Sequence, residues 1–280
     1  MADFPRTKIE NLSVSRMIIG TNWFLGWSHT SAAKDRFIQK EVTVSKSADI
    51  LEAFMRAGVD TIMGFAHNEK MMAAVKEAEQ RVGRKVIIIS TPHFDLAGTS
   101  EADAKNAKML DEEAAMGVSV CLPHACTTDV LVDKLARRIC RMDTFCKMIR
   151  ERGMIPGLST HMPEAPVYAD ESGLDVATYI QIYNAVGFLM QIEVDWVARM
   201  IWQRKHPVIT IKPMASGRLQ LFVGLSFVWA TLRDQDMVTV GAMTAEEAKE
   251  TIEISLAQLE RRSSSVPLQR TRSKKTIDGK

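Results

Sequence analysis

The sequence predicts a single α/β domain with the (β/α)8 TIM-barrel fold over residues 1–262. Eight short runs rich in β-branched residues alternate with longer segments of helical period. Several helical segments end in glycine before the next run, as in "RAGVD", "AMGVS" and "ERGMI", which is typical of the turn from a helix into a strand. A length of 280 residues is normal for one such barrel. An open doubly wound sheet is the alternative, but the sequence has neither its Gly-x-Gly-x-x-Gly turn nor a Walker A loop.

The expected strands are short, apolar and bounded by glycine or proline, and they recur at the spacing of βα units. Ligands of such barrels bind where strands end, so the residues after each strand are candidates for a site. The eight runs cover residues 16–20, 59–63, 85–90, 118–122, 154–159, 179–183, 207–212 and 237–241.

The helices between these runs carry recognisable start signals. Asn68 precedes a helical stretch as its N-cap, and Thr244 with Glu247 forms a capping box before the last helix. An apolar stripe from Leu131 to Ile149 steps by three and four residues, which predicts a helix over that whole segment.

Composition and charge exclude several classes of protein. Hydrophobic residues make up 46% and charged residues 25%, as in globular domains. Seven of the eight charged residues from 261 to 280 are basic, and residues 263–280 are expected to form a disordered basic tail. The remainder is mildly acidic, so we expect a small-molecule ligand and no nucleic-acid partner. No apolar run approaches the roughly 18 residues of a membrane span, so no membrane association is expected.

The four cysteines indicate a reducing compartment. Their spacings match no zinc ribbon, and the first residues lack the apolar core of a secretory signal. We therefore expect reduced thiols in a cytoplasmic protein, and we assign no residue as a metal ligand. The residues are Cys121, Cys126, Cys140 and Cys146.

Five of the six histidines follow a predicted strand, on the side of the barrel where ligands bind. Such a bias predicts a polar pocket able to handle protons. These residues are His29, His67, His93, His124 and His161. Lys212 ends the seventh strand, and Glu164 follows His161 closely in "STHMPEA". His124, His161, Lys212 and Glu164 are therefore the candidate catalytic residues.

The chain resembles the aldo-keto reductase superfamily in a series of motifs that run in order. "LSVSRMIIGT", "AGVDTIMGFAHNE", "VCLPHAC", "PGLST", "YIQIYNAV" and "KPMASGRL" resemble its strand ends and loops. The resemblance implies a barrel oxidoreductase that uses NADP. It also implies an aspartate, tyrosine, lysine and histidine around the substrate carbonyl, of which this chain keeps only His124. Met63 replaces the aspartate, Thr91 with Pro92 replaces the lysine, and residues 65–67 hold no tyrosine.

The cofactor contacts implied by the resemblance are better kept. A nicotinamide amide would meet Ser159, Thr160 and Gln181, and a pyrophosphate would meet the loop after the seventh strand. The family's adenosine-phosphate clamp would lie at 244–250, where this sequence has no arginine. The candidate cofactor-binding residues are Ser159, Thr160, Gln181, Met214, Gly217, Arg218 and Gly241.

Three functions remain open from the sequence. The first is an aldo-keto-reductase-like enzyme acting on a small polar molecule, sugar-like or phosphorylated, with a nicotinamide cofactor. The second is a non-redox lyase, isomerase or hydrolase in which His124, His161 and Glu164 are acid–base groups or metal ligands. The third is a non-catalytic barrel that binds the cofactor alone.

Overall fold

The computed structural model describes residues 3–267. Most of the predicted tail, from residue 268 onward, lies outside the described residues. No helix in the described part of the chain is both long enough and apolar enough to cross a membrane.

The core is a closed barrel of eight parallel strands, as the sequence predicts. Each strand pairs with the next along the chain, and the last pairs with the first. The strands are β3 (Met17–Gly20), β4 (Thr61–Gly64), β5 (Ile87–Ser90), β6 (Val118–Cys121), β9 (Ile155–Pro156) continued by β10 (Leu158–Ser159), β11 (Tyr179–Ile182), β12 (Val208–Ile211) and β13 (Met237–Val240).

The fifth barrel strand is interrupted at Gly157, and this glycine permits closure. β9 pairs with β6 on one side, while β10 pairs with β11 on the other. A Cβ at Gly157 would lie 2.9 Å from Leu122 Cδ2 and 2.9 Å from the carbonyl oxygen of Thr178. No side chain fits between the neighbouring strands at this point.

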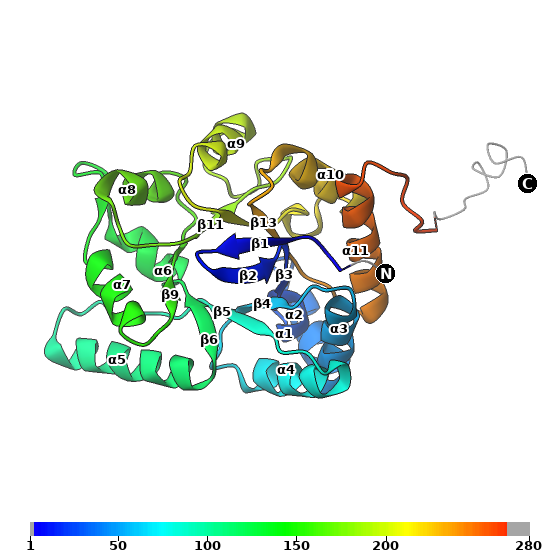
Figure 1. The fold of residues 1–280 in the computed structure, drawn as a ribbon, viewed down its shortest axis with the longest axis horizontal. Coiled ribbons are helices and arrows are strands. Elements are labelled where there is room, and N and C mark those ends of the chain that lie inside the picture. The colour runs from blue at the N-terminus through cyan, green and yellow to red at the C-terminus, as the bar shows by residue number, and fades with distance from the viewer. Residues whose placement is uncertain (1–2, 268–280) are drawn as a thin grey trace, which may run out of the picture.

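A hairpin that the sequence analysis did not anticipate covers the N-terminal end of the barrel. β1 (Arg6–Ile9) pairs antiparallel with β2 (Leu12–Ser15) and lies across the barrel centre in Figure 1. Ile9 and Val14 are fully buried and pack with Ile18, Val120 and Ile209 inside the barrel. The hairpin therefore closes the end opposite the mouth formed by the C-terminal ends of the strands.

Helices surround the barrel (Figure 1). The longer ones are α2 (Ala32–Glu41), α3 (Val44–Arg56), α4 (Glu69–Val82), α5 (Ser100–Ala115), α7 (Met142–Arg150), α8 (Ala165–Ser172), α9 (Val194–Trp202), α10 (Leu221–Thr231) and α11 (Ala245–Leu259). Short helical segments lie at the mouth: α1 (Asn22–Leu25), α6 (Ala125–Thr128), η1 (Asp129–Leu131) and η2 (Ala215–Gly217).

The predicted helix starts are confirmed. Asn68 Oδ1 accepts a hydrogen bond from the Met71 amide at 2.9 Å. Thr244 Oγ1 accepts one from the Glu247 amide at 3.1 Å. Glu247 in return accepts the amide hydrogen of Met243, the residue before the N-cap.

The prediction of one helix from residue 131 to 149 is wrong in its first half. Residues there form a small hairpin of β7 (Val132–Asp133) and β8 (Arg138–Ile139), and Leu135 at its tip is 99% exposed. Asp133 Oδ1 accepts the Ala136 amide hydrogen, which stabilises the turn. Arg141 has a left-handed φ of 59°, so the helix starts only after it.

Candidate functional site

A pocket of about 880 Å³ opens at the C-terminal mouth of the barrel. Residues that follow most of the barrel strands contribute to its wall, as expected for this fold. The lining residues include Trp23, Trp27, His29, Met63, Phe65, Thr91, His124, Ser159, His161, Lys212, Met214, Ser216, Gly217, Gly241 and Glu247.

Lys212 brings a cation into this wall. It directly follows β12 and has a left-handed φ of 61°, a conformation that costs a non-glycine residue on the order of 1 kcal/mol or more. Burial lowers the pKa of its ammonium group. Among the described residues, no carboxylate lies within ion-pair distance of its Nζ. A half-buried cation without an acidic partner is favourable only when something else supplies negative charge.

His161 faces the same pocket from the loop after β10. Its backbone amide donates to Asp129 Oδ2 at 3.1 Å. The Thr160 hydroxyl donates to the same carboxylate, so Asp129 fixes the turn that presents His161. Burial first, and then the charge of Lys212, lower the pKa of the His161 imidazole.

His124 follows β6 and is half-buried in the wall. Its Nδ1 accepts a hydrogen bond from the Cys126 amide at 3.2 Å, which assigns the ring hydrogen to Nε2. Burial, followed by the neighbouring His93 and His161, lowers the pKa of His124 to about 4. The ring is therefore neutral at physiological pH and offers an Nε2–H donor on the side away from Cys126.

Aromatic residues enclose the mouth. Trp23 packs on Gly241, where a Cβ would lie 2.5 Å from Trp23 Cδ1. Trp27 meets the Phe65 ring edge-on at 5.6 Å, and Phe65 in turn stacks on His93. The long loop after β3 thus walls the pocket through Trp23 and Trp27, while Phe24 belongs to the hydrophobic core.

The structure brings together only part of the predicted site. His124, His161 and Lys212 share the pocket with Ser159, Met214, Gly217 and Gly241. The other predicted residues do not line it. Glu164 pairs with Lys134 at 2.5 Å, and Arg218 lies 4.0 Å from the Phe188 ring centroid. Thr160 and Gln181 are buried beside the pocket without reaching its surface.

The positions that the resemblance singles out lie where it implies. Met63 and Thr91 both line the pocket, and so does Phe65. A methionine supplies neither charge nor a proton. The positions where the resemblance implies an aspartate and a lysine therefore lie in the same pocket as His124, but they hold residues that supply the charge of neither.

Sequence reasoning missed several groups. Glu247 was assigned to a helix cap, but it also lines the pocket. Glu113 is a fully buried carboxyl group that accepts the Ser90 hydroxyl hydrogen, with its Oε1 lying 3.7 Å from His67 Nε2. His93 and Cys126 meet His124, and the His-x-Cys spacing of "HAC" could have signalled the Cys126 part of this cluster but not His93.

No family model matches the sequence, and no curated protein matches it significantly. Many solved structures do resemble it. PA4992 of Pseudomonas aeruginosa, assigned to the aldo-keto reductases, superposes with a TM-score of 0.65 at 15% identity over 91% of this chain and 95% of its own. An aldo/keto reductase from Klebsiella pneumoniae in complex with NADP and acetate superposes with a TM-score of 0.59 at 18% identity, over 97% of this chain and 99% of its own. An aldo/keto reductase from Brucella melitensis superposes with a TM-score of 0.60 at 13% identity, over 93% of this chain and 98% of its own.

The chain has the aldo-keto reductase fold. Within that fold, its residues fit NADP only in part. Ser159 and the loop of Met214, Ser216 and Gly217 face the pocket. Thr160, however, gives its hydroxyl hydrogen to Asp129, and Gln181 does not reach the surface.

The other end of the pocket fits a phosphate poorly. Glu247 places a carboxylate in the wall after β13, where the resemblance puts the family's adenosine-phosphate clamp. Like charges at short range repel, so an added phosphate would be destabilised there. These residues do not fit NADP in the way the resemblance implies.

Proposed function

We propose that the chain is a divergent member of the aldo-keto reductase superfamily that acts on a small polar molecule carrying an anionic group. The observation that carries this proposal is Lys212, a cation in the pocket wall with no carboxylate partner among the described residues. A sugar phosphate or a sugar acid would supply the missing negative charge.

Two imidazoles accompany the cation. His161 is fixed through its backbone by Asp129, and its lowered pKa leaves a neutral ring able to accept a proton. His124 presents Nε2–H, which can donate a hydrogen bond to an oxygen of the bound molecule. In this arrangement Lys212 binds the anionic group, and His161 and His124 face the reacting atoms. This arrangement supports proton transfer, as in an isomerase or lyase, better than the reduction known from the fold.

A nicotinamide-dependent reaction is the second candidate, favoured by the pocket-facing Ser159, Met214 and Gly217. The Klebsiella neighbour holds NADP, which supports dinucleotide binding by fold resemblance. Because Glu247 opposes a phosphate at the far end of the pocket, NADH should bind this chain more tightly than NADPH. Trp23 and Trp27 line the pocket, so either dinucleotide would change tryptophan fluorescence when it binds.

A location in the cytoplasm belongs to the same proposal. All four cysteines are free, as is usual in a reducing compartment.

Thermal unfolding with a matched set of sugars tests the main proposal. Glucose 6-phosphate and gluconate each carry an anionic group, and glucose serves as the neutral control. A ligand at 100 times its Kd stabilises the folded state by about 2.7 kcal/mol, so binding appears as a higher Tm. We expect the Tm to rise with either glucose 6-phosphate or gluconate and to stay unchanged with glucose. Equal rises with all three sugars, or a rise only with NADH, would contradict it.

A further inference from the structure

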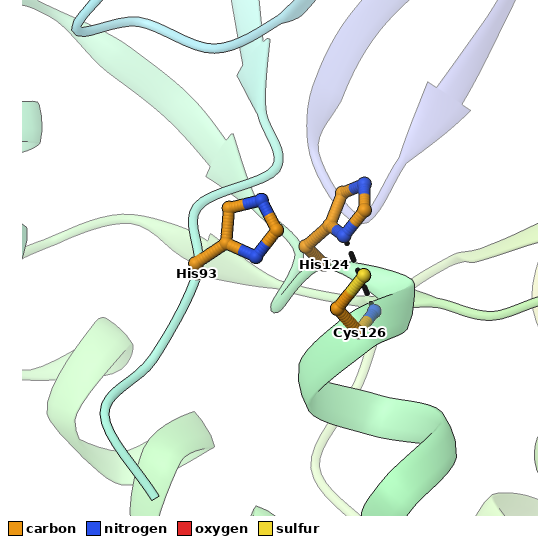
Figure 2. A group of neighbouring side chains, drawn as sticks. All are labelled: His93, His124 and Cys126. Atoms are coloured by element: carbon orange, nitrogen blue, oxygen red, sulfur yellow. Dashed lines mark hydrogen bonds between the residues drawn. The ribbon is translucent and has the colours of Figure 1, made fainter.

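Two loops at the barrel mouth bring the pocket residue His124 together with two side chains that do not line the pocket, His93 and Cys126. His93 follows β5, while His124 and Cys126 follow β6, the neighbouring strand (Figure 2). One ligand atom from each of the three residues lies within 4.8 Å of the other two. The rings of His93 and His124 are 4.4 Å apart between centroids. In Figure 2, the Cys126 sulfur and His124 Nδ1 lie on the same side of the cluster.

The two loops are held together by hydrogen bonds. The His124 amide donates to the Pro92 carbonyl oxygen at 2.9 Å. The Phe94 amide donates to Thr127 Oγ1 at 3.1 Å, which ties the first loop to α6. The Phe65 ring stacks on His93 at 5.4 Å with an interplanar angle of 9°. The three side chains are therefore mounted on a fixed frame, as a preorganised ligand set requires.

We propose that His93, His124 and Cys126 bind a divalent metal ion of the zinc type. A thiolate and two imidazoles form a mixed sulfur and nitrogen ligand set. Such a set binds zinc in preference to magnesium or calcium. Three protein ligands leave one position for water, as in many zinc sites that are not purely structural. His93 and Cys126 are exposed, so an ion can enter from solvent.

The nitrogen of His124 that a metal needs already faces the cluster. Nδ1 accepts the Cys126 amide hydrogen at 3.2 Å, so its lone pair is unprotonated and directed to that side. A bound ion would replace this hydrogen bond and keep the ring hydrogen on Nε2. It would thereby hold His124 in the orientation that presents Nε2–H to the pocket, a positioning role for the metal.

This ligand set differs from the one considered from the sequence. Glu164 is occupied by Lys134 and does not line the pocket, so a site of His124, His161 and Glu164 is not formed. The cluster of His93, His124 and Cys126 also stands independently of the anion proposal, because none of its evidence involves Lys212.

Metal titration of the full chain tests this site. Protein without a histidine tag is stripped with a chelator, reduced, and titrated with Co²⁺ and Zn²⁺. We expect one ion per chain and a thiolate-to-cobalt charge-transfer band, which Zn²⁺ then abolishes. Cys126→Ser should remove that band, and His93→Ala should weaken zinc binding about tenfold or more.

Matched variants control for folding and for surface binding. Cys140→Ser and His206→Ala remove a thiol and an imidazole elsewhere and should bind zinc like the wild type. Thermal unfolding of each metal-free variant confirms that the fold is retained. The proposal is overturned by three results: no stoichiometric binding, a cobalt spectrum without the thiolate band, or binding unchanged in folded Cys126→Ser and His93→Ala.

Discussion

Lys212 and His161 line one pocket from different strands, and the charge of Lys212 adds to burial in lowering the pKa of His161. The ammonium group of Lys212 has itself a lowered pKa, caused by burial. Burial thus disfavours the charged form of both groups, and no acidic partner of Lys212 lies within ion-pair distance among the described residues. This arrangement is expected of a site that binds an anionic ligand.

Lys212→Met should stabilise the ligand-free protein at pH 7, by roughly 0.5–2 kcal/mol. The folded-state pKa of Lys212 lies below its unfolded value, so the unfolded chain binds more protons between the two values. Wild-type stability therefore rises with pH through that window, and the advantage of the variant shrinks toward pH 10. Urea unfolding at both pH values measures this difference. Lys205→Met, at an exposed position, should show neither effect.

Gly157→Ala should destabilise the barrel by about 1–3 kcal/mol. The added methyl group would lie 2.9 Å from Leu122 Cδ2, Thr178 Cγ2 and the Thr178 carbonyl oxygen, at the break between β9 and β10. Gly117→Ala is a comparison, because its Cβ meets nothing within 4 Å and only the left-handed φ of 83° opposes it. Chemical denaturation compares the two. A Gly157 variant as stable as the wild type would show that closure does not depend on this residue.

Glu113→Gln should remove a pH dependence of stability. Burial raises the pKa of Glu113, so the folded state binds more protons than the unfolded one between about pH 4.3 and the raised value. Wild-type stability therefore falls as pH rises through this window. The free energy of unfolding of Glu113→Gln should depend less on pH. Above the window, this variant should be more stable than the wild type by about 1 kcal/mol. Glu112→Gln, on the exposed side of the same turn, serves as control, and an unchanged slope in Glu113→Gln would refute the assignment.

Much of the fold follows from the sequence because the barrel strands are short apolar runs between glycines and helices. The convergence of His124, His161 and Lys212 also follows, since strand ends share one rim. Other features depend on distant partners. The segment that forms the hairpin of β7 and β8 has apolar residues at helical spacing by coincidence. Glu164 does not line the pocket because it forms an ion pair with Lys134. The contact of His93 with Cys126 depends on the β5–β6 register, which no local pattern reveals.

Reduction of simple aldehydes should be absent or very weak in this chain. Met63 and Thr91 stand in the pocket where the resemblance expects an aspartate and a lysine, and residues 65–67 supply no tyrosine. Loss of a positioned proton donor alone lowers a rate by about 10²–10⁴-fold. NADPH and NADH oxidation with a panel of aldehydes and sugars measures this. Turnover at rates typical of the superfamily would contradict the prediction.

The central claim, that Lys212 binds the anionic group of a small polar ligand, is tested most directly by a fluorescence titration. Trp23 and Trp27 line the pocket and report binding of glucose 6-phosphate to the wild type, Lys212→Met and Lys205→Met. Loss of a charge-assisted contact should weaken binding about 10- to 100-fold in Lys212→Met alone. Equal affinity in all three proteins, with each variant folded, would contradict the claim.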